Sequence, residues 1–392
     1  MLNLKVIGAG AAGNKAAIGL IESGFNKDNV TLINSTSRDI PEEFKDISLI
    51  FGAKPNSYGG CGKERELGKK LIIDDMKNGV IKIDNIVDGS TDVVIIVSST
   101  EGGSGSAITP ILAKYIKEVL GVHVITVLLF GFNSDVRGMQ NSVNICQELQ
   151  DNYGVIGISN AKFLDVANGN TLKAEDLANK QFANIVRILS GVDLEPEYQN
   201  IDDTDLLKLV TTPGYMVVET TGTAKIKNVD QFNKTIQKAI DESTLIDCSE
   251  KGAKRIGLIF DNPNDMNSSI DFTGSVIKDE YGMPYEMYTH VQDMNKCTIT
   301  WIVSGLPLPI DEIKDIYEKY IENSKNVNKS KDSFFDSISE LKENEEDGMF
   351  DMFTKGESKT KSKASFFAEV SSSDVKTVKT KLTTDVTEEY VK

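Results

Sequence analysis

The sequence predicts an α/β protein with a Rossmann-type parallel-sheet domain, a central helix, a smaller second α/β domain and a flexible C-terminal tail. Three observations lead to this fold class. Apolar strand patterns alternate with helical patterns through about residue 170, which is typical of parallel strands joined by crossover helices. Two glycine-rich turns each follow an apolar strand and lead into a helix. At 392 residues, the chain can also hold two domains, a core and a tail.

The first domain is predicted over residues 1–170. Its expected strands cover residues 2–7, 30–33, 92–97, 122–130 and 154–158, and its expected helices cover residues 64–78, 106–120 and about 140–150. A long central helix follows over residues 171–190, because Ala178, Phe182 and Leu189 recur at helical spacing.

The second domain is predicted over residues 191–308, where the alternation continues on a smaller scale. Its expected strands cover residues 215–220, 255–260, 284–290 and 297–304, and its expected helices cover residues 229–246 and 269–278. An acidic segment, Asn200-Ile201-Asp202-Asp203-Thr204-Asp205, precedes these elements. Pro307 and Pro309 introduce a last helical segment, predicted over residues 309–322.

A flexible tail is predicted over residues 323–392. This segment is rich in Lys, Ser, Glu and Thr and has no long apolar stripe, a composition typical of disorder. Its acids gather between Glu340 and Asp351, and its lysines gather between Lys355 and Lys381. Phenylalanines recur along it in the manner of short docking motifs. The alternative interpretation is a solubilising extension, because blocks of like charge are usually solvated.

Composition excludes several classes of function. The net charge of −16 disfavours a general nucleic-acid groove, so any contact with DNA is expected to run through a partner. The four cysteines form no C-x-x-C pair and only two histidines are present, which disfavours structural zinc and a disulfide framework. The sequence shows no cationic leader and no apolar run long enough for a membrane span. We therefore expect a cytoplasmic protein without a membrane partner.

The two glycine-rich turns point to a nucleotide. The first lies at Gly8-Ala9-Gly10-Ala11-Ala12-Gly13 and the second at Glu101-Gly102-Gly103-Ser104-Gly105-Ser106. Two such turns on parallel strands of one sheet imply a polyphosphate held from two sides by backbone N–H groups and helix N-termini. A P-loop is excluded, because the nearby Gly62-Lys63 is followed by Glu64 and lacks the first glycine of that motif.

A Rossmann NAD(P) oxidoreductase is the enzymatic alternative, since the first turn satisfies G-x-G-x-x-G. That class needs an acid at the end of the second strand to bind the ribose hydroxyls. Here the strand ends in Leu32-Ile33-Asn34-Ser35-Thr36, without the acid. The second glycine turn also has no role in NAD binding, whereas a triphosphate can use both turns.

Several ordered motifs resemble those of the tubulin/FtsZ superfamily. The second turn is similar to the signature G-G-G-T-G-[ST]-G, the first turn to the first FtsZ loop, and Ser159-Asn160-Ala161-Lys162-Phe163-Leu164 to P-N-D-K-L-L. The acidic segment at residues 200–205 fits the N-x-D-x-x-D loop that follows the family's central helix. The resemblance covers about residues 1–320 and implies a GTPase that polymerises head to tail.

Two departures refine the resemblance. Glu101 and Ala107 replace the first and last glycines of the signature, and the ribose-contacting E-G-x-x-R becomes Asn133-Ser134-Asp135-Val136-Arg137. Contacts of Glu101 and Asn133 with the nucleotide are therefore in doubt, while Arg137 is retained. Together with the tail, these changes make the chain most similar to the TubZ type, which partitions plasmid and phage DNA. The tail is then expected to bind a DNA-binding adaptor.

The resemblance and the turns together predict the GTP or GDP site. Its expected residues are Gly10, Ala11, Ala12, Asn14, Gly102, Gly103, Ser104, Gly105, Ser106, Asn133, Arg137, Asn160 and Asn179. The glycine amides are expected to hold phosphates, with the two serine hydroxyls adding hydrogen bonds, although the glycines could serve the turns alone. Asn14 is expected near the base or sugar, or is a plain helix N-terminal residue. Asn179 aligns with the residue that reads the guanine edge.

The acidic segment supplies the expected catalytic residues, Asn200, Asp202 and Asp205. By resemblance this loop enters the neighbouring subunit, where its carboxylates orient the attacking water, so that hydrolysis depends on polymerisation. The alternative is an acid cluster that only stabilises a helix N-terminus. Mg²⁺ is expected to bridge phosphate oxygens with few protein ligands.

The predicted function is a filament-forming GTPase that segregates plasmid or phage DNA through an adaptor. The alternatives are an FtsZ-like cell-division GTPase, the oxidoreductase above, and a tubulin-like scaffold that binds nucleotide without hydrolysis. A loop at Gly59, Gly60 and Gly62 resembles the family's γ-phosphate-sensing loop, or is a loose surface loop.

Overall fold

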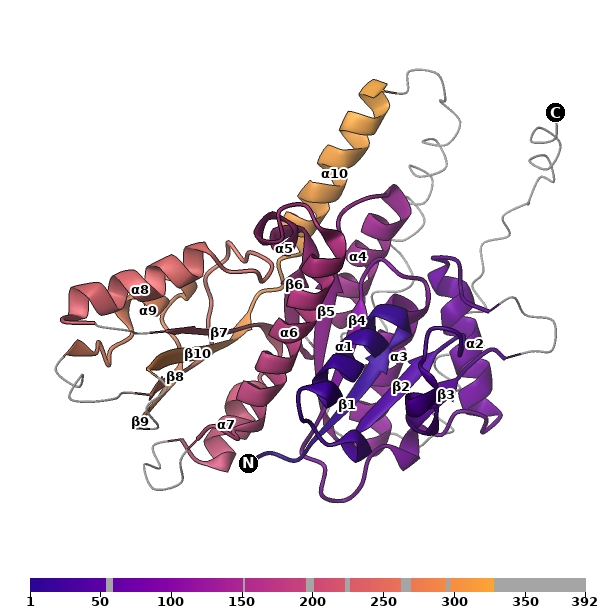
Figure 1. Cartoon of the computed structure of the whole chain (residues 1–392), viewed down its shortest axis with the longest axis horizontal. Helices are drawn as coiled ribbons and strands as arrows, with labels where there is room; N and C mark the ends of the chain where they lie inside the picture. The colour runs from indigo at the N-terminus through magenta and orange to yellow at the C-terminus, as the bar shows by residue number, and fades with distance from the viewer. Residues whose placement is uncertain are drawn as a thin grey trace.

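The computed structural model describes residues 1–53, 59–150, 152–194, 201–222, 226–261, 269–293 and 297–327. Within these residues the strands form one ten-stranded sheet, in the order β3-β2-β1-β4-β5-β6-β7-β10-β8-β9 (Figure 1). The strands are β1 Leu4–Ala9, β2 Val30–Asn34, β3 Ser48–Ile50, β4 Val93–Ser99, β5 His123–Phe130, β6 Gly154–Ser159, β7 Gly214–Gly222, β8 Arg255–Asp261, β9 Glu286–Gln292 and β10 Thr298–Leu306.

Helices cover both faces of this sheet. The α-helices are α1 Gly10–Glu22, α2 Arg65–Lys77, α3 Ser104–Tyr115, α4 Val136–Leu149, α5 Asn160–Val166, α6 Thr171–Ser190, α7 Asp203–Val210, α8 Val229–Asp241, α9 Ser275–Tyr281 and α10 Ile310–Val327. A short π-helical turn, Ile116–Leu120, extends α3. The first six strands in the sheet order are parallel: β3, β2, β1, β4, β5 and β6. Strand β10 runs antiparallel to its neighbours β7 and β8. The predicted mostly parallel α/β class is confirmed.

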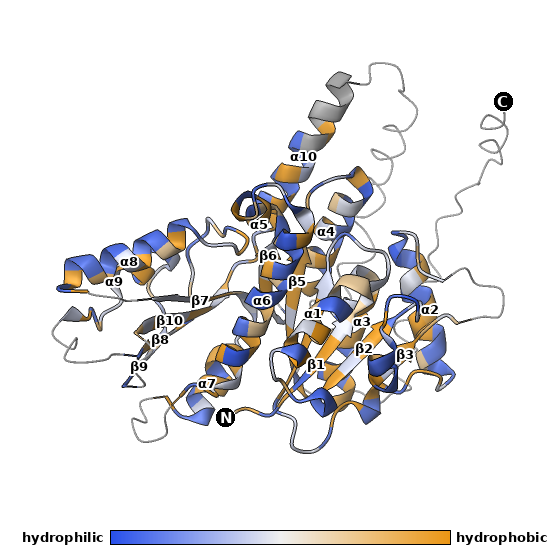
Figure 2. Cartoon of the chain, in the orientation of Figure 1, coloured by the Kyte–Doolittle hydropathy of each residue, from blue (hydrophilic) through white to orange (hydrophobic). Residues whose placement is uncertain are grey.

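Strand β4 shows how the sheet separates two cores. Val93, Ile95 and Val97 face the core beneath α1 and α6, while Val94 and Ile96 face the core beneath α2, α3 and α4. Side chains of a strand alternate between faces, and a parallel strand buried on both faces is apolar throughout. Figure 2 shows this apolar colour along the central strands, with the hydrophilic colour on the outer helices.

The sheet is continuous across the boundary between the two predicted domains. Its link there is a short parallel pairing of β6 with β7, at Gly154 with Gly214 and Val155 with Tyr215. The division of the chain into domains at residues 170, 190 and 308 stays a prediction. α6 coincides with the predicted central helix. α10 runs past the predicted end at residue 322, and the predicted tail from residue 328 onward lies outside the described residues.

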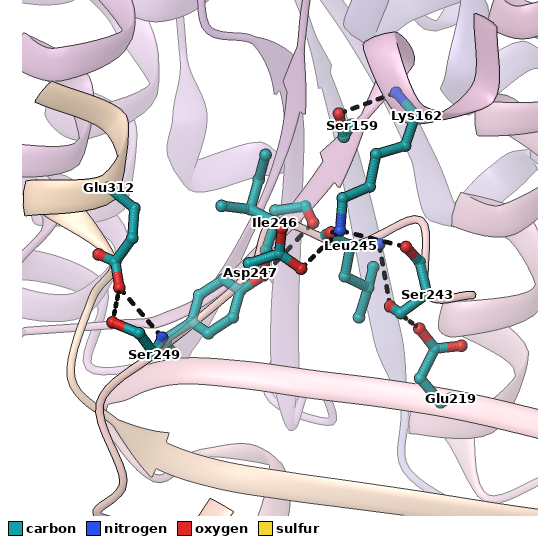
Figure 3. Close-up of polar contacts among 11 residues, drawn as sticks. Ser159, Lys162, Glu219, Ser243, Leu245, Ile246, Asp247, Ser249 and Glu312 are labelled. Carbon is teal, nitrogen blue, oxygen red and sulfur yellow. Dashed lines mark hydrogen bonds and ion pairs between the residues drawn. The ribbon is translucent and has the colours of Figure 1, made fainter. Parts of the chain in front are cut away.

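A polar seam also joins the two halves of the sheet (Figure 3). We define it as Lys162 of α5, Glu219 of β7 and the segment from Ser243 to Asp247. The Lys162 ammonium donates to the carbonyl oxygens of Ser243 (3.2 Å) and Leu245 (2.8 Å) and to the carboxylate of Asp247 (2.6 Å). The Ser243 hydroxyl donates to Glu219 at 2.5 Å. The polar groups of the seam thus satisfy one another.

Two predicted helices are wrong at one end. The helix predicted over residues 229–246 ends at Asp241, because Leu245 leaves the helical path to form a bridge with Ile158 beside β6. The helix predicted from residue 269 begins only at Ser275. There the carboxylate of Asp271 accepts from the backbone N–H groups of Thr273 (3.0 Å) and Ser275 (3.1 Å), which is a local turn that competes with helix. Strand β3 and helix α5 were not predicted.

Candidate functional site

The two glycine turns meet at the carboxyl edge of the sheet. β1 and β4 are parallel neighbours, with Ala9 opposite Ser98, so the turns that follow them lie side by side. A Cβ built on Gly10 would lie 2.7 Å from the backbone nitrogen of Gly105, and one built on Gly105 would lie 2.5 Å from the carbonyl oxygen of Ala9. The predicted pair of turns on one sheet is therefore present as a single packed unit.

A cavity of about 240 Å³ lies over this unit. It is lined by Ala9, Gly10, Ala11, Ala12, Asn34, Ser35, Thr36, Asp39, Gly60, Ser99, Gly102, Gly103, Ser104 and Gly105. Seven of the predicted binding residues therefore line the same cavity, together with the loop after β2: Gly10, Ala11, Ala12, Gly102, Gly103, Ser104 and Gly105.

Both helices that start at the cavity have free N-termini. Ala9 precedes α1 and Gly103 precedes α3, and neither residue gives a side-chain cap or is followed by an acid in the first turn. Several other helices are capped by side chains, for example α5 by Ser159 and α6 by Asn170, whereas α2 and α9 also lack such a cap. The first N–H groups of a helix lack partners within the helix and carry a partial positive charge. The cavity is therefore suited to an anion such as phosphate.

Packing explains most of the glycines, and one glycine stands apart. A Cβ on Gly13 would lie 2.2 Å from the carbonyl oxygen of Val97, and one on Gly103 would lie 2.7 Å from the Cα of Lys63. Nothing lies within 4 Å of a Cβ built on Gly102, which has no positive φ and lines the cavity. Neither packing nor backbone conformation therefore requires glycine here, and its contact with a ligand stays a prediction.

Two predicted site asparagines that do not line the cavity keep buried amide atoms without partners. Asn14, in the first turns of α1, is fully buried, and neither its Oδ1 nor its Nδ2 has a hydrogen-bond partner. Asn160, the first residue of α5, has a buried Oδ1 in the same condition. Unpaired buried polar atoms are costly, and a ligand that pairs them removes that cost. The residues present therefore fit a nucleotide with polar groups on its base or sugar.

The loop before α2 and the segment after β5 are joined by polar contacts. Lys63, at the end of the Gly59–Gly62 loop, forms an ion pair with Asp135, which precedes α4. Arg137 forms an ion pair with Glu64 at 3.5 Å. The Nδ2 of Asn141 donates to the carbonyl oxygens of Lys63 (3.1 Å) and Glu101 (3.2 Å). These contacts hold the Gly59–Gly62 loop and Lys63 against the segment that follows β5.

Glu101 turns toward the loop after β5. Its Oε1 accepts a hydrogen bond from the backbone N–H of Asn133 at 3.1 Å, and burial raises the pKa of its carboxyl group. Gly131 and Gly138 leave room for this side chain. Asn133 itself adopts a left-handed conformation with φ 54°. In this sequence the carboxylate of Glu101 therefore supports the backbone at the position where the family places its ribose-contacting motif.

The two signature serines already have partners. The hydroxyls of Ser104 and Ser35 share a hydrogen bond of 2.7 Å across the cavity wall. Ser106 is fully buried and donates to the carbonyl oxygen of Gly102. A contact of Ser106 with phosphate, like the other predicted nucleotide contacts, stays a prediction.

Asn179 lies outside the cavity lining. It is half-buried on α6 and faces α1, where its Cβ lies 3.9 Å from a Cβ built on Gly19. Gly19 follows Gly10 by nine residues on one helix, a separation of about 13 Å. One turn earlier on α6, Glu175 pairs with Lys15 of α1 at 3.6 Å. The predicted guanine-reading role of Asn179 stays a prediction.

The acidic segment lies at the opposite edge of the sheet. α6 has 20 residues and is therefore about 30 Å long. Its last residue, Ser190, accepts from the backbone N–H of Leu2, just before β1 begins, whereas the cavity lies after β1 ends. The N-terminal amine pairs with Asp203 at 2.5 Å. Figure 1 shows α7 beside the N-terminus, away from the start of α1.

The predicted catalytic acids have structural roles in α7. The Oδ1 of Asp202 accepts from the backbone N–H of Asp205 at 2.8 Å and so caps the helix. Asp205 lies 3.9 Å from Lys208. Asn200 lies outside the described residues. Asp202 therefore does stabilise the N-terminus of α7, as the alternative interpretation expects. The catalytic role of these acids stays a prediction.

The sequence did not single out two charged residues at this site. Asp39 lines the cavity and accepts from the Nδ2 of Asn34 at 3.4 Å. The backbone of Lys63 packs against Gly103, which lines the cavity. Both lie in loops without a regular pattern, so neither periodicity nor a motif marks them. Among the described residues, no group of three or more His, Cys, Asp or Glu side chains could hold a metal ion. No described helix is long and apolar enough to span a membrane.

Comparison with known proteins gives a family match for the first domain. Residues 3–168 match the sequence model of the Tubulin/FtsZ family, GTPase domain. The cell division protein FtsZ of Mycoplasmopsis pulmonis is 26% identical over 254 residues, which are 64% of this chain and 62% of that protein. The matched region thus covers less than two thirds of this relative. The match favours the GTPase interpretation over the oxidoreductase.

Solved structures show the same fold over most of the chain. The TubZ of Bacillus thuringiensis serovar israelensis, in a GTPγS-form protofilament, aligns with a TM-score of 0.67 at 16% identity, over 83% of this chain and 93% of that one. CetZ1 of Haloferax volcanii, a GDP-bound monomer, aligns with a TM-score of 0.63 at 21% identity, over 82% and 100%. The predicted tubulin/FtsZ-like fold is confirmed.

Proposed function

We propose, from the match of residues 3–168 to the GTPase domain of the Tubulin/FtsZ family, that the chain is a GTPase whose subunits assemble head to tail. In this proposal, neighbouring subunits complete each other's active sites. The observation that carries the proposal is the separation of the phosphate cavity and the acids of α7 by the full length of α6. Within one subunit, these groups are too far apart to act on one phosphate.

The cavity residues would hold the nucleotide. The free N–H groups at the starts of α1 and α3 would bind the phosphates, and the open backbone at Gly102 would let them approach closely. The unpaired amides of Asn14 and Asn160 would bind the base or sugar, with Asn179 reading the guanine edge from α6. Mg²⁺, when bound, would neutralise phosphate charge. No described cluster of acids holds it, so few protein ligands are expected.

The acids of the next subunit would complete this site. When two subunits stack along the direction of α6, the edge that bears Asp202 and Asp205 meets the edge that bears the cavity. Their carboxylates would then orient a water molecule and accept its proton, which is the role phosphoryl transfer leaves to such groups. Phosphate release would therefore depend on assembly.

We further propose that the filament segregates plasmid or phage DNA through an adaptor bound by residues 323–392. This rests on the TubZ-like departures in the signature and on the charge blocks of the tail. The fold is also shared with TubZ structures. An FtsZ-like role in cell division is the second candidate, because curated FtsZ proteins are among the sequence relatives. Removal of residues 323–392 tests whether the tail binds the adaptor or only increases solubility. If the tail binds the adaptor, its removal should abolish adaptor capture and spare nucleotide binding.

The test of the shared active site is Asp202→Asn. Asparagine caps a helix about as well as aspartate, so α7 should keep its stability while the carboxylate is lost. Phosphate release from filaments should fall by about 100-fold or more, and GTP should still bind. The measurements are phosphate release and light scattering at increasing protein concentration.

Asp203→Asn is the matched control, since it makes the same charge change one residue away, at an exposed acid that pairs with the N-terminal amine. It should leave turnover unchanged. Traces of Asp202→Asn in wild-type protein should stabilise mixed filaments out of proportion to their amount. If dilute protein below any assembly threshold hydrolysed GTP at the full rate per subunit, the shared site would be wrong.

A further inference from the structure

A buried cluster of charged side chains lies beside the start of α3. Arg65, the first residue of α2, donates through Nη1 to the carboxylate of Glu148 in α4 at 2.9 Å. Lys69, one turn later on α2, donates to the same oxygen of Glu148 at 2.9 Å. The side chains of Arg65, Lys69 and Glu148 are only 4%, 13% and 13% exposed. Burial acts to raise the pKa of Glu148, but the two cations hold it below its ordinary value, so the carboxylate is charged.

Arg65 also reaches α3 through its second terminal nitrogen. Its Nη2 donates to the backbone carbonyl oxygen of Ser106 at 3.0 Å. Within an α-helix this oxygen accepts from the backbone N–H four residues on, but here that residue is Pro110, which has no N–H. Ser106 is fully buried, and a buried carbonyl group without a partner is costly. The guanidinium group of Arg65 therefore replaces the helical hydrogen bond that Pro110 removes.

Ser106 links this contact to the cavity. Its hydroxyl donates to the carbonyl oxygen of Gly102, which lines the cavity, so Ser106 is held through both its side chain and its carbonyl group. Helix α2 also packs closely here, because a Cβ built on Gly68 would lie 3.0 Å from the carbonyl oxygen of Gly103. Arg65 and Gly68 are three residues apart and therefore lie on one face of α2, against the start of α3.

Stability alone does not require an arginine at this position. A buried ion pair contributes little net stability, because desolvation of both charges offsets their attraction. The Nε of Arg65 is also buried without a hydrogen-bond partner among the described residues. Lys69 already supplies Glu148 with a cation. What arginine adds is a planar fork of donors, which binds a carboxylate and a carbonyl group at once in fixed directions.

We propose that Arg65 is a positioning residue for the nucleotide site. By replacing the hydrogen bond lost at Pro110, it holds the first turn of α3 against α2 and α4, and through Ser106 it holds the backbone of Gly102 at the cavity. The uncapped N–H groups at the start of α3 are thereby kept in the orientation that binds phosphate. This inference rests on the proposed function, because it takes the cavity to be the nucleotide site.

The test measures GDP affinity of the full chain by calorimetry and its stability by urea unfolding. Arg65→Met should lower GDP affinity by about tenfold, which is the size of one hydrogen bond from a charged group. It should also lower stability, because Glu148 loses a cation. Pro110→Ala gives the carbonyl oxygen of Ser106 a backbone donor again and should change affinity little. In the Pro110→Ala background, Arg65→Met should no longer lower affinity, while its loss of stability should remain.

Lys69→Met is the matched control. It removes the other cation from the same carboxylate, and the second partner of Lys69, Glu66 at 3.0 Å, also lies outside α3. Stability should therefore fall while GDP affinity stays unchanged. Arg65→Lys keeps a cation beside Glu148, so it should fold even if Arg65→Met does not. One ammonium group cannot hold both partners in the geometry of the fork, so affinity should fall here too, and Pro110→Ala should again restore it.

A purely structural role of Arg65 predicts instead that affinity follows stability in every variant. The inference is wrong, while the nucleotide site stands, if the Arg65 variants bind GDP as wild type does or if Lys69→Met lowers affinity as much as Arg65→Met. It is also wrong if Pro110→Ala does not restore the affinity of the Arg65 variants. If wild-type protein binds no GDP, the proposed function fails as well.

Discussion

Two polar cavities of this protein differ in whether their polar groups have hydrogen-bond or ion-pair partners. The cavity over the glycine turns has a volume of about 240 Å³, and a second one, between β7 and α8, has a volume of about 590 Å³. The second is lined by Glu219, Thr220, Thr221, Gly222, Lys234, Thr235, Lys238, Ala239, Glu242, Ser243 and Thr244. Size alone would choose the second as the ligand site.

The polar groups of the two cavities indicate the reverse. Beside the larger cavity, Glu219 accepts from Ser243, Lys234 pairs with Asp230, and Lys238 pairs with Glu242. Beside the smaller cavity, two helix N-termini have no side-chain cap, and Asn14 has no partner at all. A cavity whose polar groups satisfy each other is complete without a ligand. A cavity whose donors lack partners is completed by one.

The largest effect that can break this comparison is expected at the glycines. Gly13 lies inside α1, where helix propensity alone predicts that alanine adds about 1 kcal/mol of stability. The contact of its Cβ with Val97 predicts instead a loss of about 3 kcal/mol, because two packed backbones must separate. Urea unfolding of Gly13→Ala measures the sign directly.

Gly102→Ala is its counterpart in the same site. Because a Cβ there meets nothing, stability should change by less than about 0.5 kcal/mol, while nucleotide affinity falls because the new methyl group occupies the approach to the phosphates. A large loss of stability at Gly102, or normal affinity, would remove the ligand-based explanation of this glycine.

The next effect concerns Glu219 in the seam. Burial raises the pKa of its carboxyl group to about 7, whereas the unfolded chain has the ordinary value of 4.5. Between these two values the folded protein binds more protons than the unfolded one, so stability falls as pH rises and levels off above about pH 7. The total loss of folding stability from this group across the pH range is at most about 3 kcal/mol.

Glu219→Gln should remove this slope, since glutamine stays neutral. We expect denaturation at several pH values between about 4.5 and 8 to show that the stability of the variant relative to wild type increases as pH rises. Nucleotide affinity should not follow the same pH profile. If it did, the larger cavity would be coupled to the ligand after all.

The smallest effect contrasts two polar side chains, one from each region. Asn14→Ala removes two unpaired buried atoms and improves helix propensity, so the free protein should gain about 1 kcal/mol while nucleotide affinity falls. Lys162→Met, in the seam, removes a donor to three acceptors and should cost about 2 kcal/mol without changing affinity. Thermal melts with and without GDP measure both quantities. Equal signs for the two variants would contradict the comparison.

Sequence patterns predicted the order of strands and helices well because most elements have a strong apolar period. α6 agrees with its predicted range to the residue, since a buried helix of that length carries its own pattern. The errors lie where a side chain redirects the backbone. The Asp271 turn delays α9, and the bridge of Leu245 to Ile158 ends α8 early. Neither contact can be read from periodicity.

The glycine motifs also predicted the cavity, but not what each glycine does. Spacing alone cannot separate Gly103, which makes room for Lys63, from Gly102, which faces open space. The same limit applies to charges. Lys63 and Asp135 are 72 positions apart in the chain. They meet only because the loop before α2 and the loop after β5 both contact the turn that follows β4.

The contact between the two glycine turns also constrains how this sequence can diverge. A side chain at Gly10 would strike the backbone of Gly105, and a side chain at Gly105 would strike Ala9. Neither turn can accept a substitution while the other keeps its present path. In an alignment of relatives, the two positions should therefore be inherited as a pair, both glycine or both changed together with an insertion that parts the loops, and single replacements at either one should be rare.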